Sequence, residues 1–177
     1  MKDRLTPFVA LFFAAATMAD ATTSWICIHK FGYDEANPLT DTTSLWSLLK
    51  PEIPAWIGGI IAVRLGFWLV FRRQNWTGAA SFAEFRAHLL ALPNAPGAFL
   101  VLVPIAFAFG RLLPVFSNAA MIAFGDSGYD QLLGKLTGAL EVDFLEAYAL
   151  SQVAIFAILI YPVAFLVHRM TARKSEG

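Results

Sequence analysis

Apolar residues fill four windows of this chain, and each window is long enough for a membrane-crossing helix. A helix rises about 1.5 Å per residue, so a hydrocarbon core of about 30 Å needs about 20 residues. The windows are Leu5 to Ile28, Pro54 to Phe71, Ala98 to Phe124 and Phe144 to Val167. The pattern predicts an all-α polytopic membrane protein, a single four-helix transmembrane domain over residues 1–177 with short interfacial helices.

Two connections contain amphipathic segments that predict short helices on the membrane surface. TSLWSLLK, residues 43–50, places leucines and Trp46 beside polar residues, which suits a helix at headgroup level. SFAEFRAHLLAL, residues 81–92, has Ser81 and Glu84 at the spacing of a capping box, and apolar residues follow at helical spacing. We expect both segments to lie along the membrane.

Small residues and prolines inside the windows predict how the helices pack. Gly58, Ala62 and Gly66 recur every four residues, a stripe that lets a neighbouring helix approach closely. Pro104 and Pro114 each remove a helix hydrogen bond. The third helix is therefore expected to be kinked or broken.

Composition agrees with a membrane protein and excludes some classes of partner and site. The chain has 58% apolar and 15% charged residues, too apolar for a soluble domain of this size. Its formal net charge of zero provides no basic field for nucleic acid. Cys27 is the single cysteine, which excludes an internal disulfide and a cysteine-rich metal site.

Lysine and arginine are unevenly distributed among the segments outside the windows. Eight flank the N-terminus, the second connection and the C-terminus, whereas three lie in the other two connections. By the positive-inside rule, both termini and the loop of residues 72–97 are cytoplasmic. We expect a multi-pass protein of the bacterial cytoplasmic (inner) membrane.

The N-terminal window has a competing interpretation. Lys2 and Arg4, a short apolar run and small residues around Ala19 also resemble a cleavable signal peptide. The apolar pattern continues through Trp25 and Ile28, which favours a retained helix.

Polar side chains inside the windows form the candidate site. In the first window they follow the i, i+3, i+4, i+7 spacing of one helix face, which must point into the bundle. A lipid-facing aspartate at the helix centre would cost about 2.5 to 3.5 kcal/mol. The predicted intramembrane polar cluster comprises Asp20, Thr23, Ser24, Arg64, Arg111, Asn118 and Glu146.

Asp20 has two candidate partners. Counting residues inward from each boundary places Arg64 and Arg111 near the midplane, within about two helical turns of Asp20. A charge-assisted bond to either is available, and Glu146 would serve the remaining arginine. Two acids and two bases make a neutral set, which favours structural ion pairing, because ion pathways usually show an excess of one sign or a relay across the bilayer.

A signature covers the end of the first helix and the following turn. Asp20, Thr23 and Ser24, then Gly32, then Glu35-Ala36-Asn37-Pro38, resemble the pattern of an uncharacterised family of small bacterial and archaeal integral membrane proteins, a domain of unknown function. The resemblance covers about a third of the chain. The family pattern has a lysine on the next helix, where this chain has Arg64, and the family lends no activity.

The signature turn is composed of Gly32, Glu35, Asn37 and Pro38. Asn37 can hydrogen-bond its own backbone and Pro38 fixes the turn. Glu35 either folds back beside Asp20 or stays in water.

Motifs that resemble catalytic sites lack their partners. GDSG, residues 125–128, matches the serine motif of rhomboid-type proteases, but His29 is the only histidine predicted on the same side of the membrane. A glycine-rich turn that ends the third helix is the simpler interpretation. We predict no catalytic residue, no cofactor and no metal site.

These observations favour a non-enzymatic accessory or assembly subunit of a larger membrane complex. One alternative is a small oligomeric transporter or channel that uses the polar seam around Asp20 and Arg111. A second is an outward-facing intramembrane hydrolase. The expected partners are the lipid bilayer and other membrane subunits or further copies of the chain, without nucleic acid.

Overall fold

The structure, a computed structural model, describes residues 3–32, 42–74 and 76–172, and these contain helices and no strand. The helices are α1 (Leu5–Phe31), α2 (Leu45–Leu49), α3 (Glu52–Phe67), the π-helical turn η1 (Trp68–Arg72), α4 (Phe82–Leu90), α5 (Ala95–Gly110), α6 (Leu112–Phe124), α7 (Gly128–Leu140) and α8 (Phe144–Thr171).

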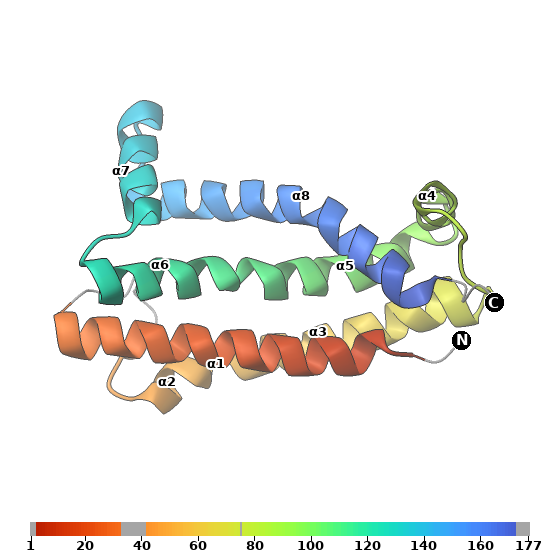
Figure 1. Cartoon of the computed structure of the whole chain (residues 1–177), viewed down its shortest axis with the longest axis horizontal. Helices are drawn as coiled ribbons and strands as arrows, with labels where there is room; N and C mark the ends of the chain where they lie inside the picture. Colours follow the sequence, from red (N-terminus) through yellow and green to blue (C-terminus); the bar gives the residue numbers. More distant parts are fainter. Residues whose placement is uncertain (1–2, 33–41, 75, 173–177) are drawn as a thin grey trace.

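Four segments of the described chain are long and apolar enough to cross a membrane. They are Leu5–Phe31, Leu45–Arg72, Ala95–Phe124 and Glu146–Thr171. The all-helical class and the four predicted windows are therefore confirmed, and the chain is a multi-pass membrane protein by length and composition. The segments run along one another, and α1 begins where α8 ends (Figure 1). We call this the termini end and the opposite end the α7 end.

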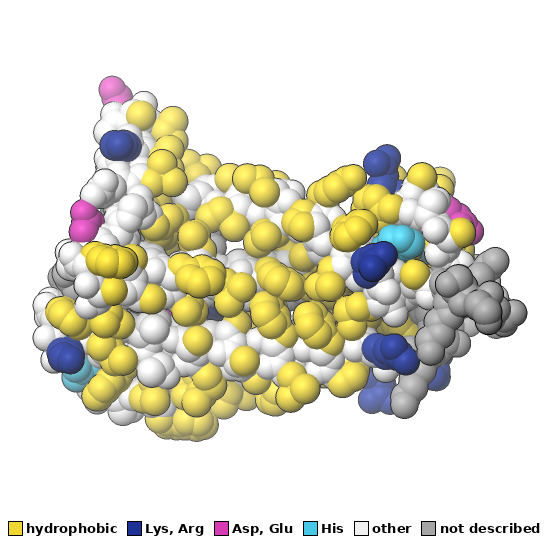
Figure 2. All heavy atoms as spheres, in the orientation of Figure 1, with side chains coloured by type: hydrophobic (Ala, Val, Ile, Leu, Met, Phe, Trp, Pro, Cys, Tyr) yellow, Lys and Arg dark blue, Asp and Glu magenta, His cyan; other side chains and the backbone are white. Residues whose placement is uncertain are grey.

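Side-chain chemistry follows this geometry. Apolar side chains cover the length of the bundle, and most of the lysine and arginine side chains visible on this face gather at the termini end (Figure 2). An apolar belt between polar ends is the surface expected for a membrane-spanning bundle.

The third segment is broken, as the prolines predict. α5 ends at Gly110 and α6 begins at Leu112, with Arg111 between them. Pro114 lacks an N–H and its ring clashes with the carbonyl four residues earlier, that of Gly110. The break therefore puts Arg111 at the junction of two helices.

The helix α3 of the second segment begins inside the bundle and not at its α7 end. α2 forms within the predicted residues 43–50, where Ser44 and Ser47 make a capping box. α3 starts at Glu52, well inside the bundle when compared with the α7 end of α1 (Figure 1). The indole Nε1 of Trp56 donates to the carbonyl of Ala10 at 2.9 Å, which fixes the level of α3 against α1.

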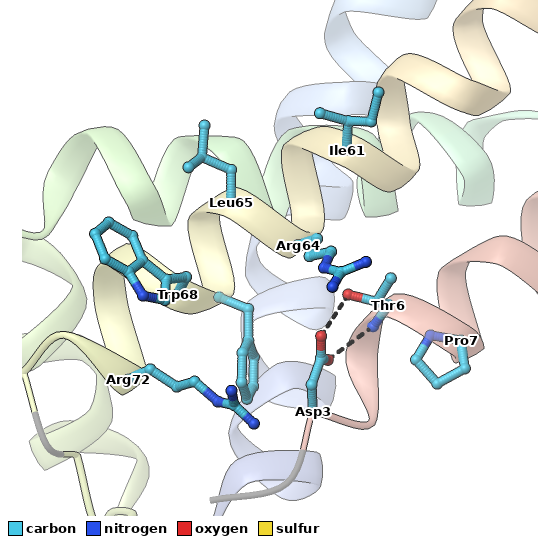
Figure 3. Close-up of a pocket in the computed structure, with 9 residues that line it drawn as sticks. Asp3, Thr6, Pro7, Ile61, Arg64, Leu65, Trp68 and Arg72 are labelled. Atoms are coloured by element: carbon cyan, nitrogen blue, oxygen red, sulfur yellow. Dashed lines mark hydrogen bonds between the residues drawn. The ribbon is translucent and has the colours of Figure 1, made fainter.

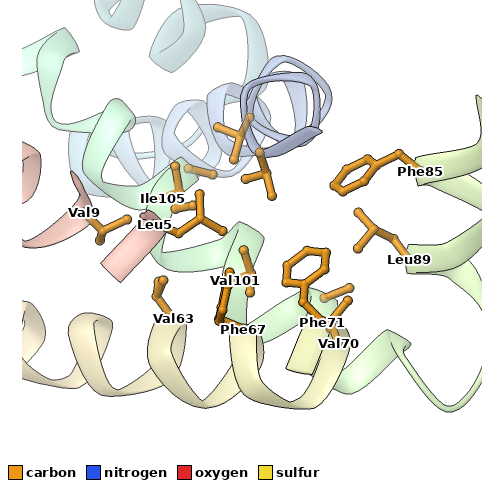
Figure 4. Close-up of a cluster of buried hydrophobic side chains, with 14 of the residues drawn as sticks. Leu5, Val9, Val63, Phe67, Val70, Phe71, Phe85, Leu89, Val101 and Ile105 are labelled. Atoms are coloured by element: carbon orange, nitrogen blue, oxygen red, sulfur yellow. The ribbon is translucent and has the colours of Figure 1, made fainter. Parts of the chain in front are cut away.

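The apolar core lies in the half of the bundle nearest the termini. Side chains of α1, α3, η1, α4, α5 and α8 meet there (Figure 4). Its most enclosed members include Leu5, Val9, Val63, Val101 and Ile105. Such close packing leaves little room for water among these side chains.

The second connection contains α4, as predicted. The Ser81 hydroxyl accepts from the backbone N–H of Glu84 at 3.2 Å, while the Glu84 carboxylate accepts from the N–H of Ala80 at 2.8 Å, one residue before the expected partner. The imidazole Nε2 of His88 lies 3.0 Å from the carbonyl oxygen of Val70 in η1. This contact ties α4 to the π-helical turn.

The third connection contains a helix that the sequence reading did not predict. α7 stands across the end of α8 rather than continuing along it (Figure 1). Asp143 and Glu146 form a capping box that starts α8. α8 then bends in its second half, where Pro162 lies inside the helix.

Candidate functional site

Arg111 lies between two carboxylates at the level where α3 begins. Its Nη1 donates to Asp20 Oδ2 at 3.3 Å, and its Nη2 donates to Glu52 Oε2. The guanidinium also lies over the Phe107 ring, 5.0 Å from the centroid. The side chains of Arg111, Asp20 and Glu52 are 22%, 14% and 23% exposed. We call these three residues the Arg111 triad.

Each member of the triad comes from a different part of the bundle. Asp20 projects from α1, Arg111 occupies the break between α5 and α6, and Glu52 is in the first turn of α3. A carboxylate in the first turn of a helix is favoured by the unpaired N–H groups and the helix dipole. One guanidinium thus joins three membrane-crossing segments.

Hydroxyl and amide groups continue the polar contacts from the triad toward the α7 end. The Asn118 side-chain amide donates to the hydroxyls of Ser24 at 3.0 Å and Thr23 at 3.4 Å. The Cys27 thiol donates to the Asn118 carbonyl oxygen at 3.6 Å. The polar face predicted on the first helix therefore faces α6, where Asn118 bonds to three of its residues.

Two members of the predicted cluster lie elsewhere. Glu146 caps α8, where its carboxylate accepts from the Asp143 N–H at 3.2 Å. Arg64 is exposed and lines a groove with Asp3 and Thr6 at the start of α1. The structure brings neither residue to Asp20.

The Trp56–Ala10 contact explains the position of Arg64. Arg64 follows Trp56 by eight residues, about 12 Å along α3, in the direction of the start of α1. Asp20 lies ten residues from Ala10 in the opposite direction, about 15 Å away. Because α3 begins well inside the bundle relative to the α7 end of α1, Arg64 lies toward the start of α1 and not beside Asp20.

Glu52 was missed as a member of the site. The apolar window begins at Pro54, so the hydropathy pattern leaves Glu52 outside the membrane-crossing segment. Proline is favoured in the first turn of a helix, so Pro54 was a signal that the helix begins a residue or two earlier. With Glu52 in place, the triad has two carboxylates for one guanidinium instead of the neutral set of four.

The signature turn is described only at its first residue. Gly32 ends α1 in the left-handed conformation, with φ of 72°, and its N–H reaches the carbonyls of Cys27 and Ile28. Glycine adopts this conformation without a Cβ clash. Glu35, Asn37 and Pro38 lie outside the described residues.

The GDSG segment forms a helix end, as expected. Gly125 is left-handed at the end of α6, with φ of 74°. Ser127 is buried, and its hydroxyl lies 2.8 Å from that of Ser117. His29 Nδ1 lies 3.1 Å from the carbonyl oxygen of Trp25 in α1. No group of three or more His, Cys, Asp or Glu in the described ranges could hold a metal ion.

A second polar network joins α7 to α8. The hydroxyls of Tyr129 and Ser151 lie 2.7 Å apart, and the Gln152 amide donates to Tyr129 at 3.1 Å. The Ser151 hydroxyl donates to the Tyr148 carbonyl, so Tyr129 donates to Ser151. This network was not among the predicted polar contacts, because it depends on α7, which was not predicted.

No family model, curated protein or solved structure matches this chain. Function is therefore inferred from the geometry of the site. The resemblance of the signature around Asp20 to a family of unknown function stays an expectation.

The side-chain amide of Asn118 is expected to stabilise the contact between α1 and α6. Interhelical hydrogen bonds in membrane proteins contribute about 0.6 kcal/mol on average and at most about 1.7 kcal/mol. We expect Asn118→Ala to lower the free energy of unfolding in detergent by about 1 kcal/mol. A double-mutant cycle with Ser24→Ala should give a coupling of about 0.6 kcal/mol, measured by reversible denaturation. Strictly additive effects would contradict the contact.

Proposed function

We propose that this chain is a non-enzymatic subunit that assembles with another integral membrane protein in the bacterial cytoplasmic membrane. The observation that carries the proposal is the incomplete enclosure of α6 and α8. None of the residues of α6 is buried. None of residues 152–162 in α8 is buried either.

The polar groups of this bundle serve its own packing. The Arg111 triad and the Asn118 contacts fasten α1, α3 and α6 to one another. Polar groups that satisfy each other hold a membrane bundle in one register. This gives the chain a fixed scaffold on which α6 and α8 present their uncovered faces.

The arrangement is less suited to transport through a single chain. The polar contacts run from Cys27 at the α7 end down to the triad. Between the triad and the termini end lie fully enclosed apolar side chains, among them Val63, Val101 and Ile105. A transport path needs polar groups or water through this half, whereas apolar packing favours a sealed bundle.

The surface around the uncovered face of α8 is mixed, with polar groups that bond to one another beside exposed apolar side chains. Gln152 and Tyr129 are half-buried, next to exposed apolar residues of α8 such as Val153. A helix of a partner protein offers both apolar contact and hydrogen-bonding groups, while lipid tails offer only the former.

Site-directed photo-crosslinking tests the proposal. A photoreactive residue is placed at Phe116 in α6, at Ile158 in α8 and, as a control, at Leu11 in α1. The three wild-type side chains have similar exposure, 66%, 71% and 75%, so all can reach a neighbour. We expect Phe116 and Ile158, and not Leu11, to form an adduct with one membrane protein in native membranes.

The partner is then identified by purifying the tagged chain in mild detergent and by mass spectrometry. A stoichiometric membrane protein that matches the adduct would support the proposal. Equal adducts at all three positions would contradict it. A chain that purifies alone, or only with copies of itself, and mediates solute flux after reconstitution would establish the transporter alternative instead.

A further inference from the structure

A groove at the termini end lies outside the Arg111 triad. It has a volume of about 650 Å³ and separates the first turn of α1 from α3 and η1. Its lining includes Asp3 and Thr6 on one side and Arg64, Leu65, Trp68 and Arg72 on the other (Figure 3).

Two guanidinium groups point into this groove. Figure 3 shows Arg64 and Arg72 extending toward Asp3 and Thr6 from the opposite wall. Within the described residues, neither arginine has an acidic side chain within 4.0 Å. The groove therefore presents two positive charges that the described part of the chain does not neutralise by ion pairing.

The π-helical turn aligns these two arginines. Eight residues of regular α-helix would turn Arg72 about 80° away from the face of Arg64. The wider turn η1, Trp68–Arg72, acts as an insertion of one residue and brings Arg72 within about 20° of that face. The His88 contact with the Val70 carbonyl holds this turn. The π-helical turn thus directs Arg72 to the same groove as Arg64.

Asp3, the one carboxylate among the described residues that line the groove, is already bonded. Asp3 accepts from the backbone N–H groups of Leu5 and Thr6, each at 3.0 Å, and from the Thr6 hydroxyl at 2.6 Å. It stabilises the start of α1, where the helix dipole favours a negative charge. With Asp3 fixed in this role, the groove has a net positive charge.

An apolar track leads from the guanidinium groups toward the middle of the bundle. Ile61 and Leu65, four residues apart on α3, are both exposed beside Arg64. Trp68 is half-exposed at the level of the arginines. Indole rings favour the headgroup region of a bilayer, and branched apolar side chains favour its acyl chains.

We propose that this groove binds an anionic phospholipid of the leaflet at the termini end. Arg64 and Arg72 hold the phosphate oxygens by charge-assisted hydrogen bonds, which a planar guanidinium can make in pairs. Ile61 and Leu65 contact the acyl chains. A soluble phosphate would use the arginines but leave the apolar track uncovered, so the combination fits a lipid.

The test measures lipids that remain bound to the full chain. Wild type and variants are reconstituted in vesicles of phosphatidylglycerol and phosphatidylcholine, extracted in mild detergent and examined by native mass spectrometry. We expect preferential retention of phosphatidylglycerol by the wild type, and a decrease of roughly fivefold for Arg64→Gln and for Arg72→Gln. Arg73→Gln, an exposed arginine of the same end that does not line the groove, should retain the lipid as the wild type does.

A competition experiment distinguishes a lipid from a soluble anion as the ligand. Excess inorganic phosphate should not displace the retained lipid, and displacement would indicate a soluble anion as the ligand. Equal retention by all variants, or an equal loss in Arg73→Gln, would overturn the proposal, since the attraction would then belong to the whole basic end. If a glutamine variant does not fold, Arg64→Lys tests the same site: it keeps the charge but loses the paired geometry, so retention should fall in part, and unchanged retention would contradict the site.

Discussion

Arg111→Met is expected to lower the free energy of unfolding by about 2 to 4 kcal/mol, the largest effect of any single substitution considered for this protein. The substitution keeps most of the apolar length of the side chain but leaves Asp20 and Glu52 without their shared cation. Carboxylates removed from water are costly when unpaired. Partial exposure of the triad reduces the cost below that of a fully buried pair. Chemical denaturation in detergent measures the change.

Control variants distinguish a loss of stability caused by breaking the triad from a general effect of removing an arginine. Arg64→Met removes an arginine of α3 that has no acidic side chain within 4.0 Å among the described residues, and it should change the free energy of unfolding by about 0.5 kcal/mol or less. Combining Arg111→Met with Asp20→Asn and Glu52→Gln should recover much of the loss, because neutral amides no longer need a cation. A stable Arg111→Met protein, or a triple variant less stable than the single one, would show that the triad does not fasten the bundle.

Much of the architecture could be predicted because apolar runs and prolines determine the backbone conformation of the segments that contain them. The four apolar windows became four membrane-crossing segments, since lipid leaves few alternatives to the helix. Pro114 indicated the break at Arg111. The face around Asp20 was also expected to point into the bundle, and it does so against α6.

Which arginine pairs with Asp20 depends on the level at which α3 packs against α1, which is set by residues far apart in the sequence. The residues before Pro54 gave no indication of how far into the bundle α3 begins. The structure sets that level through the Trp56–Ala10 contact. A shift of a few residues moves a side chain by several ångströms along the helix axis, enough to exchange Arg64 for Arg111. Window boundaries alone could not choose between the two arginines.

The small-residue stripe shows a similar limit. Gly58 and Gly66 are eight residues apart, so they point about 80° away from each other on a regular helix. The side of α3 that packs against other helices instead contains Gly59, Val63 and Gly66, at i, i+4 and i+7. The four-residue pattern identified Gly66 correctly but joined it to the exposed Gly58.

Gly66→Ala is the second substitution with a large expected effect, a loss of about 2 to 3 kcal/mol in the free energy of unfolding. A Cβ at Gly66 would lie 2.6 Å from the backbone carbonyl oxygen of Gly97 and 2.9 Å from Val101 Cγ2, so α3 and α5 must separate. Gly58→Ala is the matched control, because nothing lies within 4 Å of its new Cβ. Alanine there should stabilise the helix by about 0.5 to 1 kcal/mol. Thermal unfolding of the two variants in the same detergent compares them, and an equal change in both would mean that the close approach of α3 to α5 at Gly66 does not limit stability.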